Sequence, residues 1–205
     1  MDTYRHYAHL AEKEKEGTDY RVRVFARQNA TLAIIAPHGG AIEKGTSEIA
    51  LAIASDDFSC VLFEGIKPNK NGVLHITSGN FDEPRCCSIV GKARQTLAIH
   101  GEKNPDEKVV FLGGKDYKLG SRIQASLEQN GFVVKIHPSA WLQGTDSANV
   151  CNRNLSGAGV QLELTEALRS TFFASLDATG RKQSTEQLER FAKAVREGLN
   201  QALID

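Results

Sequence analysis

A histidine and a glutamate lie in a glycine-rich run near the start of the chain, Pro37-His38-Gly39-Gly40-Ala41-Ile42-Glu43. The apolar run before it, 31–36, is typical of a buried strand, which Pro37 is expected to end. In open α/β sheets, ligands bind at this carboxyl edge. An imidazole and a carboxylate are also two of the three protein ligands in a His₂Glu zinc site. The alternative is a tight turn with a solvated carboxylate.

Two further apolar runs end in, or contain, polar groups that can complete such a site. His100 follows the run 96–99, and Glu163 stands between two leucines in the run 159–164. A catalytic zinc site needs a carboxylate off the metal that moves the proton of water to the leaving amine. Glu163 is the candidate, because a buried glutamate is costly unless it faces a polar cavity. The alternatives are an ion pair between Glu163 and an arginine, and an ordinary histidine at a strand end.

Strands and helices alternate along the chain, which predicts one α/β domain, 1–205, with a mixed sheet flanked by helices. The predicted strands are 20–27, 31–36, 60–65, 73–78, 96–101, 109–113, 132–136 and 159–164. The predicted helices are one short helix within 1–17, then 46–54, 86–93, 119–130, 165–173 and 184–203. The first strand has a basic face and is expected at a solvated edge. The polar segment 137–155 is long enough to suggest a functional loop.

Composition excludes several classes of protein. The chain has 205 residues, and its 25 basic and 25 acidic residues give no general attraction to nucleic acid or to an anionic membrane. No apolar stretch approaches the roughly 18 residues of a membrane span, and no hydrophobic signal region opens the sequence. We therefore expect synthesis in the cytoplasm and release only by another route, such as lysis.

The four cysteines, Cys60, Cys86, Cys87 and Cys151, contain no Cys-x-x-Cys pair that would suggest a metal site. Adjacent cysteines such as Cys86 and Cys87 rarely bond to each other. We predict buried, reduced thiols.

Five motifs resemble, in order, those of the bacteriophage and prophage poly-γ-glutamate hydrolase family. They are Pro-His-Gly-Gly-Ala-Ile-Glu at 37–43, His-Ile-Thr-Ser with Asn-Phe-Asp-Glu-Pro at 75–84, Ala-Ile-His-Gly at 98–101, Asn-Val-Cys-Asn-Arg-Asn at 149–154 and Gly-Val-Gln-Leu-Glu-Leu at 159–164. The resemblance extends from about residue 20 to residue 173. It implies a fold similar to zinc carboxypeptidases, with a wider relationship to N-formylglutamate and succinylglutamate amidohydrolases.

The resemblance also implies roles for individual residues. Zinc would be held by His38, Glu43 and His100, with Glu163 as the general base. The sequence departs from the carboxypeptidase pattern in two places. Four residues rather than two separate His38 from Glu43, and the pair Asn152-Arg153, which resembles the carboxypeptidase pair that binds a terminal carboxylate, follows His100 instead of preceding it.

We therefore predict a zinc-dependent, endo-acting hydrolase of the γ-glutamyl bonds in poly-γ-glutamate. The polymer carries a carboxylate on every residue, so cations are needed, and Arg85, Arg94 and Arg153 are available. The alternative for each is an ordinary surface or ion-paired arginine, and this is the favoured interpretation for Arg94.

His75 and Thr77 fall on one side of their predicted strand and are expected to line the cleft. Asn80 and His137 are weaker candidates of the same kind. Two rival functions remain open. One is a small-substrate amidohydrolase of N-acylated amino acids, which a closed pocket would favour. The other is a non-catalytic protein that binds an acidic partner.

Overall fold

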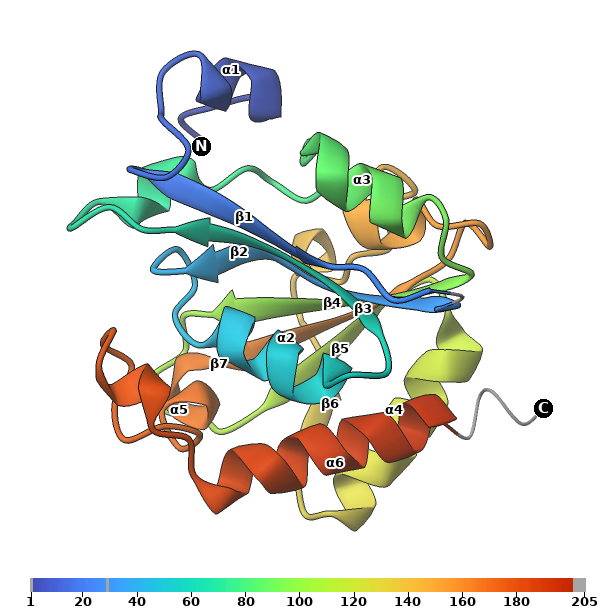
Figure 1. Cartoon of the computed structure of the whole chain (residues 1–205). Helices are drawn as coiled ribbons and strands as arrows, with labels where there is room; N and C mark the ends of the chain where they lie inside the picture. The colour runs from blue at the N-terminus through green and yellow to red at the C-terminus, as the bar shows by residue number, and fades with distance from the viewer. Residues whose placement is uncertain (1, 29, 201–205) are drawn as a thin grey trace.

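The computed structural model describes residues 2–28 and 30–200, which form one mixed sheet with helices on both faces (Figure 1). The strand order is β1-β3-β2-β4-β7-β5-β6. The bounds are β1 Tyr20–Phe25, β2 Leu32–Gly40, β3 Ser59–Gly65, β4 Gln95–Glu102, β5 Val110–Gly114, β6 Val134–Ile136 and β7 Val160–Thr165. Strands β3, β2, β4 and β7 run parallel, whereas β1 and β5 are antiparallel to their neighbours β3 and β7. The prediction of a basic edge strand at β1 is thus confirmed.

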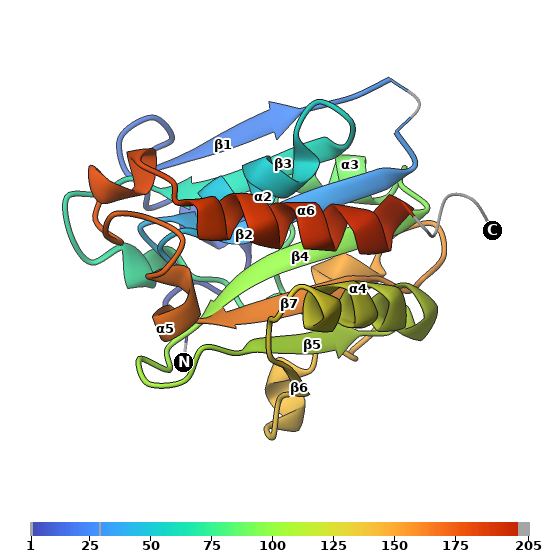
Figure 2. The same ribbon diagram turned by 90° about the horizontal axis from the view of Figure 1, so that it is seen from below.

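Two hydrophobic layers cover the sheet. The helices are α1 Tyr7–Ala11, α2 Thr46–Ala54, α3 Pro84–Val90, α4 Tyr117–Gln129, α5 Glu166–Arg169 and α6 Glu186–Asn200. Helices α2, α4 and α6 pack on one face, and α1 and α3 lie on the other (Figures 1 and 2). Successive side chains of a strand point to opposite faces of the sheet, so Ile34 lies in one hydrophobic layer and Ile35 in the other.

Helix α6 is longer than α2 and α4, with which it shares one face of the sheet. The predicted stripe of Leu188, Phe191, Val195 and Leu199 is buried against the sheet and α4. Nowhere in the ranges 2–28 and 30–200 is a helix both long and apolar enough to cross a bilayer.

The cysteines are free thiols, as predicted. Cys60, Cys86 and Cys151 are buried and Cys87 is half-buried. Burial raises the pKa of Cys60 and of Cys151 to about 12, so these two thiols stay protonated and unreactive at neutral pH.

The prediction that Pro37 ends the second strand is wrong, because β2 continues to Gly40. Ala36 pairs with Leu62 and Gly39 with Glu64, so β2 contains one more residue than β3 over this stretch. The extra residue forms a β-bulge, which lets a strand tolerate a proline that has no N–H for the ladder. The bulge lies between Ala36 and Gly39 and so contains His38, and β2 then leads into the turn that carries Glu43.

The prediction of a strand at 73–78 is also wrong. A 3₁₀ turn, Asn71–Leu74, is followed there by an irregular segment. Strand β3, which precedes it, is already paired by β1 on one edge and β2 on the other, so it has no free edge for another strand. The Asn71 side chain closes the loop with hydrogen bonds to both backbone groups of Lys67.

Candidate active site

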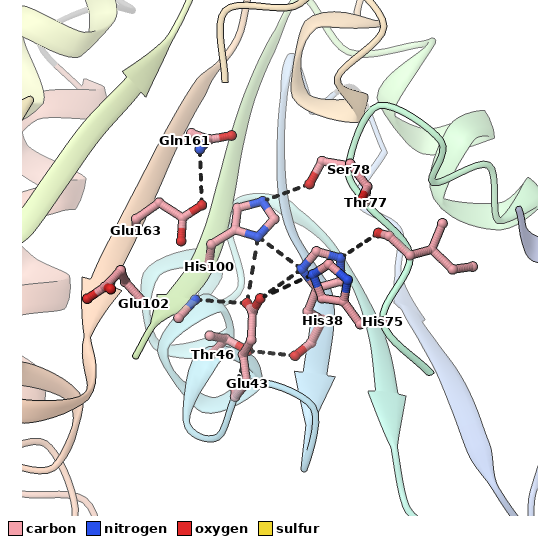
Figure 3. A network of polar contacts seen from close by, with 12 residues as sticks. His38, Glu43, Thr46, His75, Thr77, Ser78, His100, Glu102, Gln161 and Glu163 are labelled. Atoms are coloured by element: carbon pink, nitrogen blue, oxygen red, sulfur yellow. Dashed lines mark hydrogen bonds and ion pairs between the residues drawn. The ribbon is translucent and has the colours of Figure 1, made fainter. Parts of the chain in front are cut away.

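Polar side chains meet at the carboxyl ends of β2, β4 and β7, which are neighbours in the sheet (Figure 3). His38 lies near the end of β2, Glu43 in the turn after it, and His100 near the end of β4. Glu163, on β7, pairs in register with His100. These residues line a cavity of about 890 Å³. The structure thus brings together the four residues that the sequence singled out.

The donor atoms of the two imidazoles and Glu43 converge. Nδ1 of His38 lies 3.0 Å from Oε1 of Glu43 and 3.2 Å from Nδ1 of His100. Nδ1 of His100 lies 3.6 Å from Oε2 of Glu43. Tetrahedral zinc, with ligands at 2.0–2.2 Å, holds its donor atoms about 3.3 Å apart. The chemistry and the spacing of this donor set therefore fit a zinc ion.

Neighbouring groups fix the orientation of these donors. Nε2 of His38 donates a hydrogen bond to the carbonyl oxygen of Ile76 (2.7 Å), so in the neutral ring the lone pair is on Nδ1. The backbone N–H of Gly101 donates to Oε2 of Glu43 (2.8 Å). Burial opposes ionisation of Glu43, but His38 and His100 hold the pKa of its carboxyl well below the usual range. Glu43 is therefore an ionised carboxylate with a fixed orientation.

His75 offers a second way to complete a metal site. His38, Glu43 and His75 also form a group whose ligand atoms all lie within 4.8 Å of one another. The His75 ring stacks on that of His38, with centroids 4.0 Å apart and planes at 31°. Nε2 of His75 lies 3.8 Å from Oε1 of Glu43, slightly farther than the nitrogen of His100 lies from the same carboxylate.

Glu163 is buried, with 8% of its surface exposed, and Gln161 donates a hydrogen bond to it (3.2 Å). Burial, together with the charge of Glu43 and against the attraction of His100, raises the pKa of Glu163 to about 7. A carboxyl that exchanges its proton near neutral pH suits general acid–base chemistry.

An ion pair between Glu163 and an arginine was the alternative to a catalytic role. Arg169, the arginine that follows β7, is engaged by backbone carbonyls instead. Arg169 is buried behind the site and donates to the backbone carbonyls of Lys44, Glu102 and Leu164. Its role there is to tie the turn after β2 to the ends of β4 and β7.

The arginines predicted to bind substrate are not among the described residues that line the cavity. Arg85 forms a bidentate ion pair with Glu16 and bonds to Glu83. Arg94 immediately precedes β4 and therefore lies at the opposite end of that strand from His100.

Arg153 and Asn152 hold loops instead of facing the cleft. The Arg153 guanidinium donates to the carbonyl oxygens of Gly79, Phe81 and Ala148, and so joins the two loops beside the cavity. Asn152 donates to the carbonyls of Gly144 and Asp146 and accepts from the N–H of Gly159. These contacts run from side chain to backbone, and Arg153 reaches residues more than seventy positions away, which sequence patterns do not reveal.

His75 and Thr77 line the cavity, as predicted, and so does the weaker candidate Asn80. His137 packs its ring edge-on against Phe111, 4.6 Å between centroids, and is not part of the described wall.

Sequence reasoning missed Lys103 and Trp141. Lys103 lies just beyond β4 and is the one lysine or arginine among the described residues that line the cavity. Trp141 belongs to the 3₁₀ turn Ala140–Leu142 and is 95% exposed on the same wall. For Lys103 the available signal was its place directly after the strand that ends in His100.

Comparison with known proteins identifies the family. Residues 4–194 match the model of the poly-gamma-glutamate hydrolase family. The chain is 35% identical over 182 residues to the UPF0714 protein YmaC of Bacillus subtilis (strain 168), covering 88% of this chain and 76% of YmaC.

Solved structures show the same relationship. The structure of a bacteriophage poly-gamma-glutamate hydrolase matches with a TM-score of 0.95 and 32% identity, covering 99% of both chains. The apo, zinc-free structure of YNDL matches with a TM-score of 0.92 and 29% identity, covering 98% of this chain and 99% of YNDL. N-formylglutamate amidohydrolase from Ralstonia eutropha JMP134 shares the fold alone, at a TM-score of 0.51 and 11% identity over 91% of this chain and 98% of that one. The predicted mixed α/β fold is therefore confirmed, and the chain belongs to the poly-γ-glutamate hydrolase family of amide-bond hydrolases.

Proposed function

We propose that this protein cleaves the γ-glutamyl amide bonds of poly-γ-glutamate, with zinc as its cofactor and attack within the polymer. The observation that carries the proposal is the convergence of His38, Glu43 and His100 beside Glu163, on three neighbouring strands. Action outside the host cell, after lysis, is part of the proposal.

The roles follow from the chemistry of each side chain. His38, Glu43 and His100 would hold the zinc ion. The three short distances between their donor atoms favour His100 over His75 as the third ligand. When bound, zinc supplies Lewis acidity, which polarises a carbonyl and makes water more acidic. Glu163 accepts the proton of the attacking water and passes it to the leaving amine.

Lys103 is the cation that we assign to a carboxylate of the polymer. It lines the cavity and is exposed, and no ion pair engages its ammonium group within the ranges 2–28 and 30–200. A lysine acts as a mobile point charge. Such a charge suits a polymer that presents the same group at every residue as it slides through the site.

The shape of the cavity favours the polymer over a small N-acylated amino acid. Its volume of about 890 Å³ is near the upper end of the range for ordinary ligand pockets. Trp141, 95% exposed on its wall, shows that the cavity opens to solvent on that side. A chain that enters and leaves such a cleft can be cut internally, and the apolar face of Trp141 can pack against its methylene groups.

The experiment that tests the function compares two polymers. Purified protein is incubated with poly-γ-glutamate and with α-linked polyglutamate, and the products are sized by gel filtration. We expect rapid shortening of the γ-linked chain and little of the α-linked one, because the α-linked chain places its amide differently. A chelator should stop the cleavage and added zinc restore it. Equal cleavage of both polymers would contradict the γ-linkage, and full activity in metal-free protein would contradict the mechanism.

A further inference from the structure

The N-terminal segment contributes a carboxylate behind the cleft wall. Oδ1 of Asp2 lies 2.8 Å from Nδ1 of His75, and Oδ2 accepts hydrogen bonds from the backbone N–H and the hydroxyl of Thr77, each at 2.6 Å. Asp2 is more than seventy positions away from both residues. One carboxylate therefore anchors two residues that line the cavity.

The contact with Asp2 determines where the His75 ring carries its proton. An ionised carboxylate only accepts hydrogen bonds, so Nδ1 of His75 is the protonated nitrogen. In the neutral ring, the lone pair is then on Nε2, which lies on the side of Glu43 (Figure 3). Burial opposes ionisation of Asp2, but the hydrogen bonds from Thr77 and His75 outweigh it and lower its pKa. Asp2 therefore stays ionised at neutral pH.

The same N-terminal segment is also held at other points. The backbone N–H of Tyr7 donates to Oδ1 of Asp82 (2.6 Å). Glu16 pairs with Arg85 through both carboxylate oxygens. Asp82 is exposed and is not among the described residues that line the cavity, so it anchors this segment without touching the cleft wall.

We propose that Asp2 is a positioning residue, which holds His75 with Nε2 presented to the cleft as a hydrogen-bond acceptor. An acceptor at that place suits an amide N–H of the polymer. The inference rests on the proposed function for its catalytic consequence, whereas the state of the His75 ring is independent of the substrate. Neutral imidazoles are commonly oriented in this way by a carboxylate on their other nitrogen.

The test uses the zinc-loaded full chain and three variants: Asp2→Ala, the matched control Asp82→Ala, and His75→Gln. Long-range ¹H–¹⁵N NMR of the histidine rings reports which nitrogen carries the proton, and the loss of a signal in His75→Gln assigns it. We expect the Nδ1–H form of His75 in the wild type and in Asp82→Ala, and a mixture of forms in Asp2→Ala.

Kinetics and metal content complete the test. We expect kcat/KM on poly-γ-glutamate to fall about 10- to 100-fold in Asp2→Ala, mainly through kcat, with zinc content unchanged. Asp82→Ala should stay within about twofold of the wild type. Asp2→Ala should cause a smaller loss when added to His75→Gln than when made in the wild type, since the imidazole that Asp2 orients is then already gone.

Three results would overturn the proposal. They are an unchanged His75 signal in Asp2→Ala, an equal kinetic loss in Asp82→Ala, and loss of zinc from Asp2→Ala, which would make His75 a metal ligand. If the wild type does not cleave the polymer, the proposed function fails, and the NMR comparison alone then decides whether Asp2 positions His75.

Discussion

The floor and the rim of the cleft are built in different ways. The floor consists of His38, Glu43, His100 and Glu163, which stand on strand ends or on the turn directly after one. The rim consists of Lys103, just beyond β4, and of the loops 75–80 and 140–149, whose backbone is held by side chains such as Arg153 and Asn152. The floor is mostly buried, whereas the rim includes Trp141 at 95% exposure. The sheet thus fixes the four floor residues, whereas the loops border the opening of the cleft.

The largest expected effect comes from removing a floor ligand. His38→Ala deletes one of the three proposed zinc ligands, so we expect the purified protein to lose zinc and activity together. Metal analysis alongside the polymer assay checks this. A variant that keeps one zinc per chain would place the metal elsewhere. The control is His137→Ala, because His137 lies off the described cavity wall and its loss should leave zinc in place.

Glu163→Gln tests the floor without removing a ligand. The amide keeps the shape of the side chain but cannot accept the proton, so kcat should fall about 10²- to 10⁴-fold while zinc stays bound. Loss of zinc from this variant would mean that Glu163 is itself a ligand.

The same residue should make the metal-free protein sensitive to pH. The pKa of Glu163 is about 7 in the folded state, against an ordinary value of 4.5. Between these values the folded state holds a proton that the unfolded state has released, so stability falls as the pH rises from 4.5 through 7. Glu163→Gln has no such proton. It should be more stable than the wild type by roughly 1–3 kcal/mol above pH 7, and about equal at pH 4.

Chemical denaturation across this pH range measures the difference in the free energy of unfolding. Glu107→Gln is the control, because Glu107 is an exposed carboxylate paired with Lys135. It should show almost none of the pH-dependent gain, and a gain equal to that of Glu163→Gln would contradict the assignment.

The smallest effect is expected at the rim. Lys103→Ala should raise KM for poly-γ-glutamate about 5- to 10-fold with little change in kcat, since it removes a contact made equally before and during reaction. Added salt should weaken substrate binding less in this variant. The control is Lys92→Ala, because Lys92 is an exposed lysine before β4. Its KM should equal that of the wild type. An unchanged KM in Lys103→Ala would mean that Lys103 does not bind the polymer and that one of the arginines supplies the cation.

The same contrast explains what the sequence could predict. Buried strands have long apolar runs, so the strands β2, β4 and β7 and the four floor residues near their carboxyl ends were found from sequence. The bulge at Pro37 was not, because it depends on the register with β3. The segment 73–78 has the alternation of a strand, but the sheet had no edge left for it.

The predicted substrate arginines were misplaced for a related reason. A charged residue in the sequence does not reveal which group it will pair with in the fold. Arg85 is engaged by Glu16, which lies sixty-nine positions away, and Arg153 by backbone carbonyls of two loops. The contact between Asp2 and His75 is equally distant along the chain. Such pairings follow from the tertiary fold and have no local pattern.

Trp141 also provides an intrinsic fluorescence probe of the cleft. It is the single tryptophan of the sequence, and it stands almost fully exposed on the cavity wall. Its indole is therefore the sole tryptophan source of intrinsic emission, and in the free protein that emission should be that of an indole in water. A polymer that covers the ring should shift the emission to shorter wavelength and shield it from a dissolved quencher. Occupancy of the site can then be titrated in the Glu163→Gln protein, without a label and without turnover.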